Sequence, residues 1–445
     1  MGVILVFIYL LGVYTGVILY LTPTLFIPTF IAGCAAILLL LKNIRRVQKS
    51  HLKPMFGLLV IALLTLFFAP NREAYFIERF KGFISLAYAL VSAYVLFLEM
   101  SRWDRRAVAR VFGVFSVLII VGCLFENYTD FRDVSDAFRS EVFKQDLYGG
   151  LYRDYTQFGM IRPKLFTAEP SHVAKFFLFS VTMWLALTQR RKKYLKLIVM
   201  MGVGFFLIRS PIVLLAVPSA LLLFVYLDYG GVRKLLSSAG IEGTFKLSIL
   251  GISLGIGLIV AFQTILAPRI ELIMTGRDTS FIGRILAPPV VTYHTLRKSP
   301  YFGAGIEGKE AIVRELTAAF ASFGMIQNVR GWDFDILINR IANVFWLHWI
   351  YFGLIGGIFA AYMIGRLMKN LGGTHYILCI ALVLMFSQTM GGYVSVKIWT
   401  FVLMIFLIST LHDRNDTNIS QKPSQLYQKK SESLPSPHNN ESIDI

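Results

Sequence analysis

The feature that most constrains this chain is a series of apolar runs, each long enough to cross a bilayer as a helix, separated by short basic segments. Of its 445 residues, 56% are hydrophobic and 16% are charged. A soluble domain carries about 25% charged residues, so this chain is too apolar to fold as one. The alternation of polar and apolar residues typical of an outer-membrane barrel does not occur. We therefore expect an all-α, polytopic membrane protein.

The runs predict about twelve transmembrane helices within one integral membrane domain, residues 1–411. They lie near residues 2–21, 25–41, 55–69, 83–100, 111–125, 171–188, 194–208, 211–227, 247–265, 341–363, 376–391 and 393–411. The tail, residues 412–445, is rich in Ser, Asn, Pro and Gln, and we expect it to be disordered.

Basic clusters follow the second, fourth and sixth runs, and short basic loops stay on the cytoplasmic side of a membrane. The clusters are Lys42, Arg45, Arg46, Lys49 and Lys53; Arg102, Arg105, Arg106 and Arg110; and Arg190, Arg191, Lys192, Lys193 and Lys196. Both termini, including the tail, are then expected in the cytoplasm. Two long loops, at about 126–170 and 266–340, are expected on the opposite face.

These two loops also carry many basic residues, and arginine outnumbers lysine in both. Long loops cross a membrane regardless of their charge, so the orientation is unaffected. The planar guanidinium group can bind phosphate through two hydrogen bonds, which suits arginine to phosphate recognition. Much of the formal net charge of +18 lies in the short loops between spans, where the positive-inside rule places it, so this charge does not imply nucleic acid. The alternative for any single arginine is a solvated or acid-paired surface.

The stretch 162–177 places ionisable side chains at the start of a membrane span, where charge is costly unless it has a use. Pro170 is expected at the first helical position, and Glu169 just before it lies at the positive end of the helix dipole. The other ionisable residues that matter here are Arg162, His172 and Lys175. The alternative is a capped, ion-paired helix start without further function.

Arg277 and Arg284 stand seven residues apart in the second loop, so a helix there would place them on one face, two turns apart. The same step leads to Val291 and Lys298, and His294 lies close to that face. Such a row could grip a diphosphate and offset the charge that appears on it as a bond breaks. The alternative is an ion pair between the neighbouring aspartate and either arginine.

Four other residues and one short motif carry predictions. Arg209, at the outer turn between two spans, could reach a lipid phosphate or snorkel to the membrane surface. Asn343 is expected at the outer end of a span, shortly after Arg340, and His348 lies about a turn and a half deeper, as a hydrogen-bonded packing residue. Asp333-Phe334-Asp335 matches the DxD pattern, which is common by chance, so we expect no metal and no other cofactor.

Several motifs together resemble a known family. They are Arg-Pro, Phe, Glu-Pro-Ser-His and Ala within 162–174, Gly-Arg-Asp at 276–278, Ser-Pro-Tyr-Phe-Gly-Ala-Gly at 299–305, and Asn followed by Phe-Gly-Leu-Ile-Gly within 343–356. This order is similar to that of the O-antigen polymerase and ligase group of bacterial membrane proteins. The resemblance covers roughly residues 160–360, and the Glu-Pro-Ser motif with its upstream arginine resembles the polymerases (Wzy type).

The resemblance implies a GT-C-like glycosyltransferase in the bacterial cytoplasmic (inner) membrane, active on its periplasmic face in lipopolysaccharide or other polysaccharide biosynthesis. Such an enzyme moves the growing glycan from undecaprenyl diphosphate to the non-reducing end of a new undecaprenyl-diphosphate-linked repeat unit, without a metal. Donor and acceptor are then lipid-linked oligosaccharides, and a chain-length regulator and a flippase are expected partners. Nucleic acid is not an expected partner.

Under this resemblance, the residues receive roles. Glu169 is the first candidate for the base or for orienting the acceptor, with Arg162 and His172 around it, and His294 is an alternative base. The diphosphate is assigned to Arg277, Arg284, Arg209 and Lys298, and further substrate contacts are assigned to Asn343 and Arg340.

Two alternatives stay open. An O-antigen ligase would pass finished glycan to another acceptor, but ligases typically carry a histidine before the asparagine, where this chain has Ala342. A flippase for lipid-linked oligosaccharides would also have about twelve spans. Transporters commonly show internal repeats and charged sites near the bilayer midplane, whereas this chain shows no duplicated half and its charged motifs lie in the loops.

Overall fold

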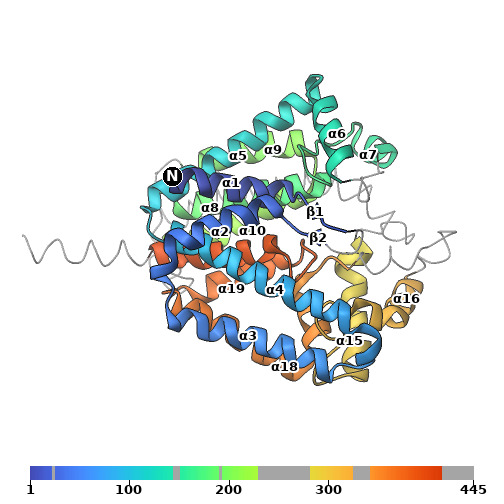
Figure 1. Ribbon diagram of the computed structural model, residues 1–445. Coiled ribbons are helices and arrows are strands. Elements are labelled where there is room, and N and C mark those ends of the chain that lie inside the picture. The colour runs from blue at the N-terminus through green and yellow to red at the C-terminus, as the bar shows by residue number, and fades with distance from the viewer. Residues whose placement is uncertain (23–25, 144–150, 190–192, 229–280, 324–340, 413–445) are drawn as a thin grey trace, which may run out of the picture.

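The computed structural model describes residues 1–22, 26–143, 151–189, 193–228, 281–323 and 341–412. Figure 1 shows a bundle of helices, with α6, α7, α15 and α16 gathered at the end away from the N-terminus. The helices of the described residues are α1 (Gly2–Thr15), α2 (Phe30–Asn43), η1 (Ile44–Arg46), α3 (Lys49–Phe68), α4 (Arg72–Met100), α5 (Arg105–Tyr128), α6 (Phe131–Val142), α7 (Leu151–Phe158), α8 (Pro170–Leu187), α9 (Lys193–Ile208), η2 (Pro211–Leu215), α10 (Ala216–Leu223), η3 (Phe224–Asp228), η5 (Ile282–Leu286), α15 (Ala287–Lys298), η6 (Gly308–Ile312), α16 (Val313–Ser322), α18 (Val344–Asn370), α19 (Tyr376–Ser387) and Val396–His412.

The apolar helices give the chain the character of a helical membrane protein, as expected from its composition. Within the described ranges, six helices are long and apolar enough to cross a membrane: α3, α4, α5, α8, the continuous segment Pro211–Asp228 and α18. Shorter apolar helices are α1, α19 and Val396–His412. The span expected near 247–265 and the tail beyond His412 lie outside the described residues. The count of twelve spans stays a prediction.

The expected span 2–21 is wrong in its last part, residues 16–21. α1 ends at Thr15, because Gly16 adopts a left-handed conformation with φ +67°. The chain then forms a small antiparallel hairpin of β1 (Leu19–Tyr20) and β2 (Phe26–Ile27), and α2 begins five residues later than the predicted 25. Pro23 and Pro28 in this segment cannot donate backbone hydrogen bonds, which disfavours a continuous helix.

Two other helices begin earlier than their apolar windows. α3 starts at Lys49 rather than 55, and α4 starts at Arg72 rather than 83. Their first turns are polar, so a search for apolar residues does not see them. In α4 the polar start is set off by a kink at Tyr75, where φ is −121° and ψ is 20°. The predicted loop 126–170 is likewise largely helical, since it contains the end of α5, α6 and α7.

The core around α8 joins helices from both ends of the chain. α8 packs along α5, and it also contacts α1 and α10. Phe401 stacks on Phe179 of α8 with ring centroids 4.0 Å apart, and it contacts Phe176 edge-on at 5.1 Å. Tyr14 of α1 meets Phe176 at 5.3 Å. These aromatic contacts hold α1, α8 and the helix Val396–His412 together, and the candidate site lies where these three helices meet.

The turn Ser299–Gly305 docks into a break in α18. Gly353 interrupts that helix with φ +68° and ψ −166°, which frees backbone groups that the turn then satisfies. Ala304 N donates to Ile350 O at 2.7 Å, and Leu354 N donates to Pro300 O at 2.6 Å. The turn therefore fixes the C-terminal end of α15 onto α18.

Candidate active site at the mouth of α8

α8 begins where the sequence predicts, at Pro170, with Glu169 as the residue just before the helix. The Glu169 side chain is exposed and makes no capping hydrogen bond to the helix backbone. Its Oε2 accepts a hydrogen bond from Ser171 Oγ at 2.9 Å. A simple helix cap therefore does not explain this carboxylate. The positive end of the α8 dipole lies beside it and favours anions there.

The turn that leads into α8 has an uncommon backbone, because Leu165 and Phe166 have positive φ angles of 40° and 61°. Such angles are rare for residues with a Cβ and persist where the surroundings fix them. The buried carboxylate of Glu126, in the last turn of α5, does so here. It accepts hydrogen bonds from the backbone N–H of Lys164 at 2.9 Å and of Leu165 at 2.6 Å. α5 thereby sets where α8 and Glu169 begin.

α6 holds the same turn from another side. Arg139 donates from Nε to Thr167 O at 2.8 Å, from Nη2 to Ala168 O at 3.0 Å and from Nη1 to Asp136 Oδ1 at 2.6 Å. Burial raises the pKa of Asp136, but its hydrogen bond to Arg139 and the charge of Lys164 outweigh burial and hold the pKa below its ordinary value. Burial and the Arg139 charge lower the pKa of Lys164, against the opposing effect of Asp136.

Three cations from distant parts of the chain meet at this helix mouth. Lys175 of α8 interacts electrostatically with Arg284, Glu169 and Lys397, and Lys397 interacts with Glu169. His172 interacts with Lys397, Lys175 and Arg284. Its Nδ1 is buried without a hydrogen-bond partner in the described structure. We call these five residues the α8 mouth cluster. Among the described groups that act on its histidine and lysines, Glu169 is the carboxylate and the other charges are positive.

Lys397 is placed by α1. It is the lysine of the apolar helix Val396–His412, and its Nζ lies against Gly16, where an added Cβ would approach it to 2.5 Å. Gly16 ends α1, so the ammonium group lies at the negative end of the α1 dipole, which favours a cation. One turn deeper, Tyr9 and Thr400 share a buried hydrogen bond of 2.8 Å between their hydroxyl oxygens.

Arg284 is placed by the start of α18. It lies half-buried in the π-helical turn η5, directly before α15. Asn343, the N-cap of α18, donates from Nδ2 to Arg284 O at 2.8 Å and to Gln388 Oε1 at 2.7 Å, and its Oδ1 accepts from Trp346 N at 3.4 Å. Asn343 therefore holds the backbone of the arginine. The sequence predicts that Asn343 binds substrate, whereas its contacts in the structure are to the protein.

The structure places Arg162 and Arg209 in other contacts. Arg162 is buried and pairs with Asp154, with Nη2 and Nε 2.7 and 3.0 Å from Oδ1, and its guanidinium lies 4.4 Å above the Phe158 ring. Arg209 donates from Nη1 to the Phe158 carbonyl and lies over Phe206. Both arginines therefore hold the segment around α7, and these contacts favour a structural role over catalysis or diphosphate binding.

The predicted row along α15 does not form one cationic face. Val291 is fully buried, whereas Lys298 is exposed and pairs with Glu315 Oε1 at 3.1 Å. Fourteen residues separate Lys298 from Arg284, which is about 21 Å along a helix and too far for both to hold one diphosphate. His294, ten residues from Arg284, is exposed and contacts the Tyr293 ring. These distances separate Lys298 and His294 from the α8 mouth cluster.

Several predictions fall outside the described residues. These are the roles of Arg277 and Arg340 and the status of Asp333-Phe334-Asp335. Within the described ranges, no group of three or more His, Cys, Asp or Glu side chains could hold a metal ion. His348 is the packing residue that the sequence predicts, because it is buried and hydrogen-bonds Tyr393 Oη at 3.1 Å and Gly357 O at 2.9 Å.

The sequence reasoning missed Lys397 and gave Lys175 no role. A signal for Lys397 existed, since an ionisable residue within an apolar span marks a functional site by default. It was hidden because the partner charges lie more than 100 residues away in the chain, on α8 and at Arg284.

Comparisons with protein-family models, curated proteins and solved structures gave no match to this chain. The chemistry of the α8 mouth cluster therefore has to be argued from its own residues. An excess of cations beside a helix N-terminus can bind a multiply charged anion and stabilise further negative charge on it. A carboxylate at the same place can accept a proton from a hydroxyl group.

Proposed function

We propose that this chain is a membrane glycosyltransferase of the O-antigen polymerase type. It transfers a growing glycan from undecaprenyl diphosphate to the non-reducing end of a new lipid-linked repeat unit. The observation that carries the proposal is the α8 mouth cluster, in which Lys175 and Lys397 both interact with Glu169, and Arg284 interacts with Lys175. The motifs at 162–174 and 299–305 add the resemblance described above.

Cations that lie close together repel one another, and this repulsion costs free energy. Cations that are half removed from water repel one another more strongly than in solution, because the local dielectric constant is low. A single carboxylate offsets part of that repulsion. A bound diphosphate, with a negative charge on the oxygens of each phosphate group, would offset the remainder, and the positive end of α8 would add to its binding.

The proposed reaction assigns a task to each part of the cluster. The bond between the anomeric carbon and the diphosphate oxygen breaks, and the acceptor hydroxyl oxygen forms a new bond to that carbon. The hydroxyl proton passes to Glu169, and the diphosphate leaves with additional negative charge. Lys175, Arg284 and Lys397 stabilise this charge, which is the electrostatic role that a metal ion has in other glycosyltransferases. His172 is a second candidate for the proton acceptor.

The test replaces cations in a strain that lacks the chromosomal copy of the gene. Lys175→Met and Lys397→Met should each abolish polymer and leave single repeat units on the surface lipid. Lys298→Met is the matched control: it makes the same Lys-to-Met change far from the cluster, at the C-terminal end of α15, and should keep normal chain length. The amount of each variant in the membrane is measured by immunoblot.

Two outcomes would contradict the proposal. Normal polymer from both Lys175→Met and Lys397→Met would remove the cluster from catalysis. Loss of all surface glycan in the deletion strain, including single repeat units, would identify a flippase or a ligase instead. Glu169→Gln separates the proton acceptors, because polymer in this variant would transfer that role to His172.

A further inference from the structure

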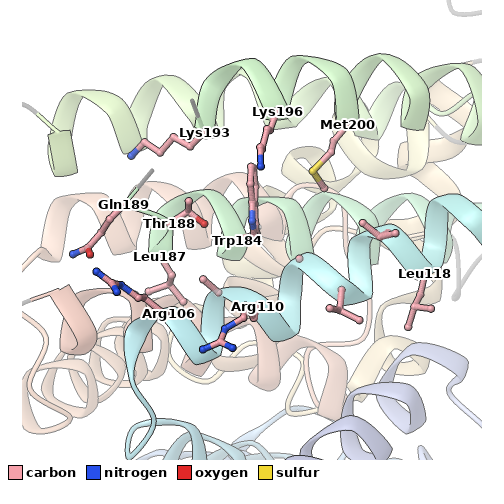
Figure 2. Close-up of a pocket in the computed structure, with 14 residues that line it drawn as sticks. Arg106, Arg110, Leu118, Trp184, Leu187, Thr188, Gln189, Lys193, Lys196 and Met200 are labelled. Atoms are coloured by element: carbon pink, nitrogen blue, oxygen red, sulfur yellow. The ribbon is translucent and has the colours of Figure 1, made fainter. Parts of the chain in front are cut away.

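A groove lies at the other end of α8, between α5 and α9. Its volume is about 820 Å³. Figure 2 shows Arg106 and Arg110 on α5, Lys196 reaching from α9 toward Trp184, and Thr188 and Gln189 after the end of α8. The rest of the lining is mainly apolar and includes Val114, Val117, Leu118 and Met200. The groove therefore has one basic end and one apolar end.

The basic end carries charge that no carboxylate of the described residues neutralises. Lys193, also in the lining, pairs with Asp228 at 2.7 Å. Arg106, Arg110 and Lys196 are exposed, and no carboxylate pairs with them in the described part of the chain. Two arginines and a lysine thus line one groove, and the guanidinium group suits phosphate.

The apolar end has the depth of one membrane leaflet. From Arg106 to Leu118, α5 rises about 18 Å, slightly more than half of a hydrocarbon core about 30 Å thick. Val114, Val117 and Leu118 leave 49%, 50% and 55% of their surface exposed along this distance. A ligand that fits has a phosphate at one end and hydrocarbon of single-leaflet length behind it.

We propose that this groove binds one anionic phospholipid, whose phosphate lies among Arg106, Arg110 and Lys196 and whose acyl chains lie along Val117 and Leu118. The occupant is anionic because three cations exceed the single charge of a zwitterionic lipid phosphate, which its own ammonium group also offsets. The site lies at the opposite end of α8 from Glu169, about 27 Å along that helix. The lipid therefore supports the packing of α5, α8 and α9, and it is not the glycosyl substrate.

The test uses the full-length protein, purified in detergent and examined by native mass spectrometry with added phosphatidylglycerol or phosphatidylcholine. The wild-type chain should keep one phosphatidylglycerol at detergent concentrations that remove phosphatidylcholine. The triple variant Arg106→Gln, Arg110→Gln, Lys196→Gln should bind phosphatidylglycerol roughly 100-fold more weakly, since each basic residue near anionic lipid contributes about a factor of five. The same lipid should raise the unfolding temperature of the wild-type chain more than that of the variant.

The matched control removes three exposed charges outside the groove, in the variant Arg45→Gln, Lys49→Gln, Lys53→Gln. It should bind phosphatidylglycerol like the wild-type chain. Val117→Trp tests the apolar end independently, because the indole would fill the groove while all the charges remain, and it should also release the lipid. Equal binding by the wild-type chain and the triple variant, equal retention of the two lipids, or a polyprenyl phosphate in place of phospholipid would overturn the proposal.

Discussion

Replacing Gly353 with alanine should destabilise the protein, because this residue carries the break in α18. Its φ of +68° and ψ of −166° lie in a region that glycine alone occupies without strain. A Cβ at this position would lie 2.5 Å from Gly303 N and 2.7 Å from Phe302 N. Both are backbone atoms, so rotation of a side chain cannot relieve the clash.

The magnitude follows from two contributions. Holding alanine in this backbone conformation costs about 1–3 kcal/mol. Moving the turn Ser299–Gly305 away from the new Cβ would also break the hydrogen bonds on each side of the break, from Ala304 N to Ile350 O and from Leu354 N to Pro300 O. These contribute about 1 kcal/mol each. The free energy of unfolding should therefore fall by about 3–5 kcal/mol.

Gly365 of the same helix provides the matched control. It is exposed, and a Cβ there would meet no atom within 4 Å. Alanine is favoured over glycine within a helix, so Gly365→Ala should stabilise the protein by about 0.5–1 kcal/mol. The two substitutions are chemically identical but should act in opposite directions.

The assay is thermal unfolding in one detergent, followed with a thiol-reactive dye that reports exposure of the buried Cys123 and Cys379. Gly353→Ala should lower the midpoint by on the order of 5 °C, and Gly365→Ala should raise it slightly. If Gly353→Ala unfolds at or above the wild-type midpoint, α18 is not broken at this residue and the reasoning fails.

Three other predictions concern the supports of the site. Glu126→Gln should cost about 1–3 kcal/mol in thermal unfolding, because an amide oxygen cannot serve both backbone N–H groups and one is left buried without a partner. Asp136, whose pKa the ion pairs with Arg139 and Lys164 hold below its ordinary value near 3.9, stabilises the fold above about pH 4 and loses this contribution as the pH falls further. Asp136→Asn should therefore weaken the fold at neutral pH and flatten the acid limb of a stability–pH profile, and an unchanged limb would contradict the role. Asn343→Ala should lower the unfolding midpoint and shorten the polymer, and normal polymer would show that the arginine backbone needs no such support.

Structural features that depend on a local sequence pattern are predicted well. The helical membrane class follows from apolar runs, and the start of α8 follows from Pro170 and its place after a polar turn. The search for apolar runs misplaces the end of the first helix, because the left-handed Gly16 ends α1 inside an apolar run. It also fails at Lys49 and Arg72, where helices continue into polar sequence.

The candidate site also has one part that the local sequence predicts and one part that depends on how the helices pack. Glu169 and His172 are visible because they stand in one short motif at one helix start. The placement of Arg284 and Lys397 near His172 and Lys175 depends on how α18, α1 and the helix Val396–His412 pack, and no local spacing encodes it. A seven-residue step is a helical regularity, and for this reason it selected Lys298, which lies on the same helix but too far away.

The signs of the charges distinguish a ligand site from an ion-pair network. In a network of pairs, each removal leaves an uncompensated partner and weakens the fold. In the α8 mouth cluster the cations outnumber Glu169 within the described structure, so removing Lys175 relieves repulsion, while removing Glu169 increases it. If the cations are there to bind a ligand, a variant that lacks one of them should lose function while its stability stays the same or rises. Stability and polymer length measured on the same variants therefore separate the two interpretations, which neither measurement does alone.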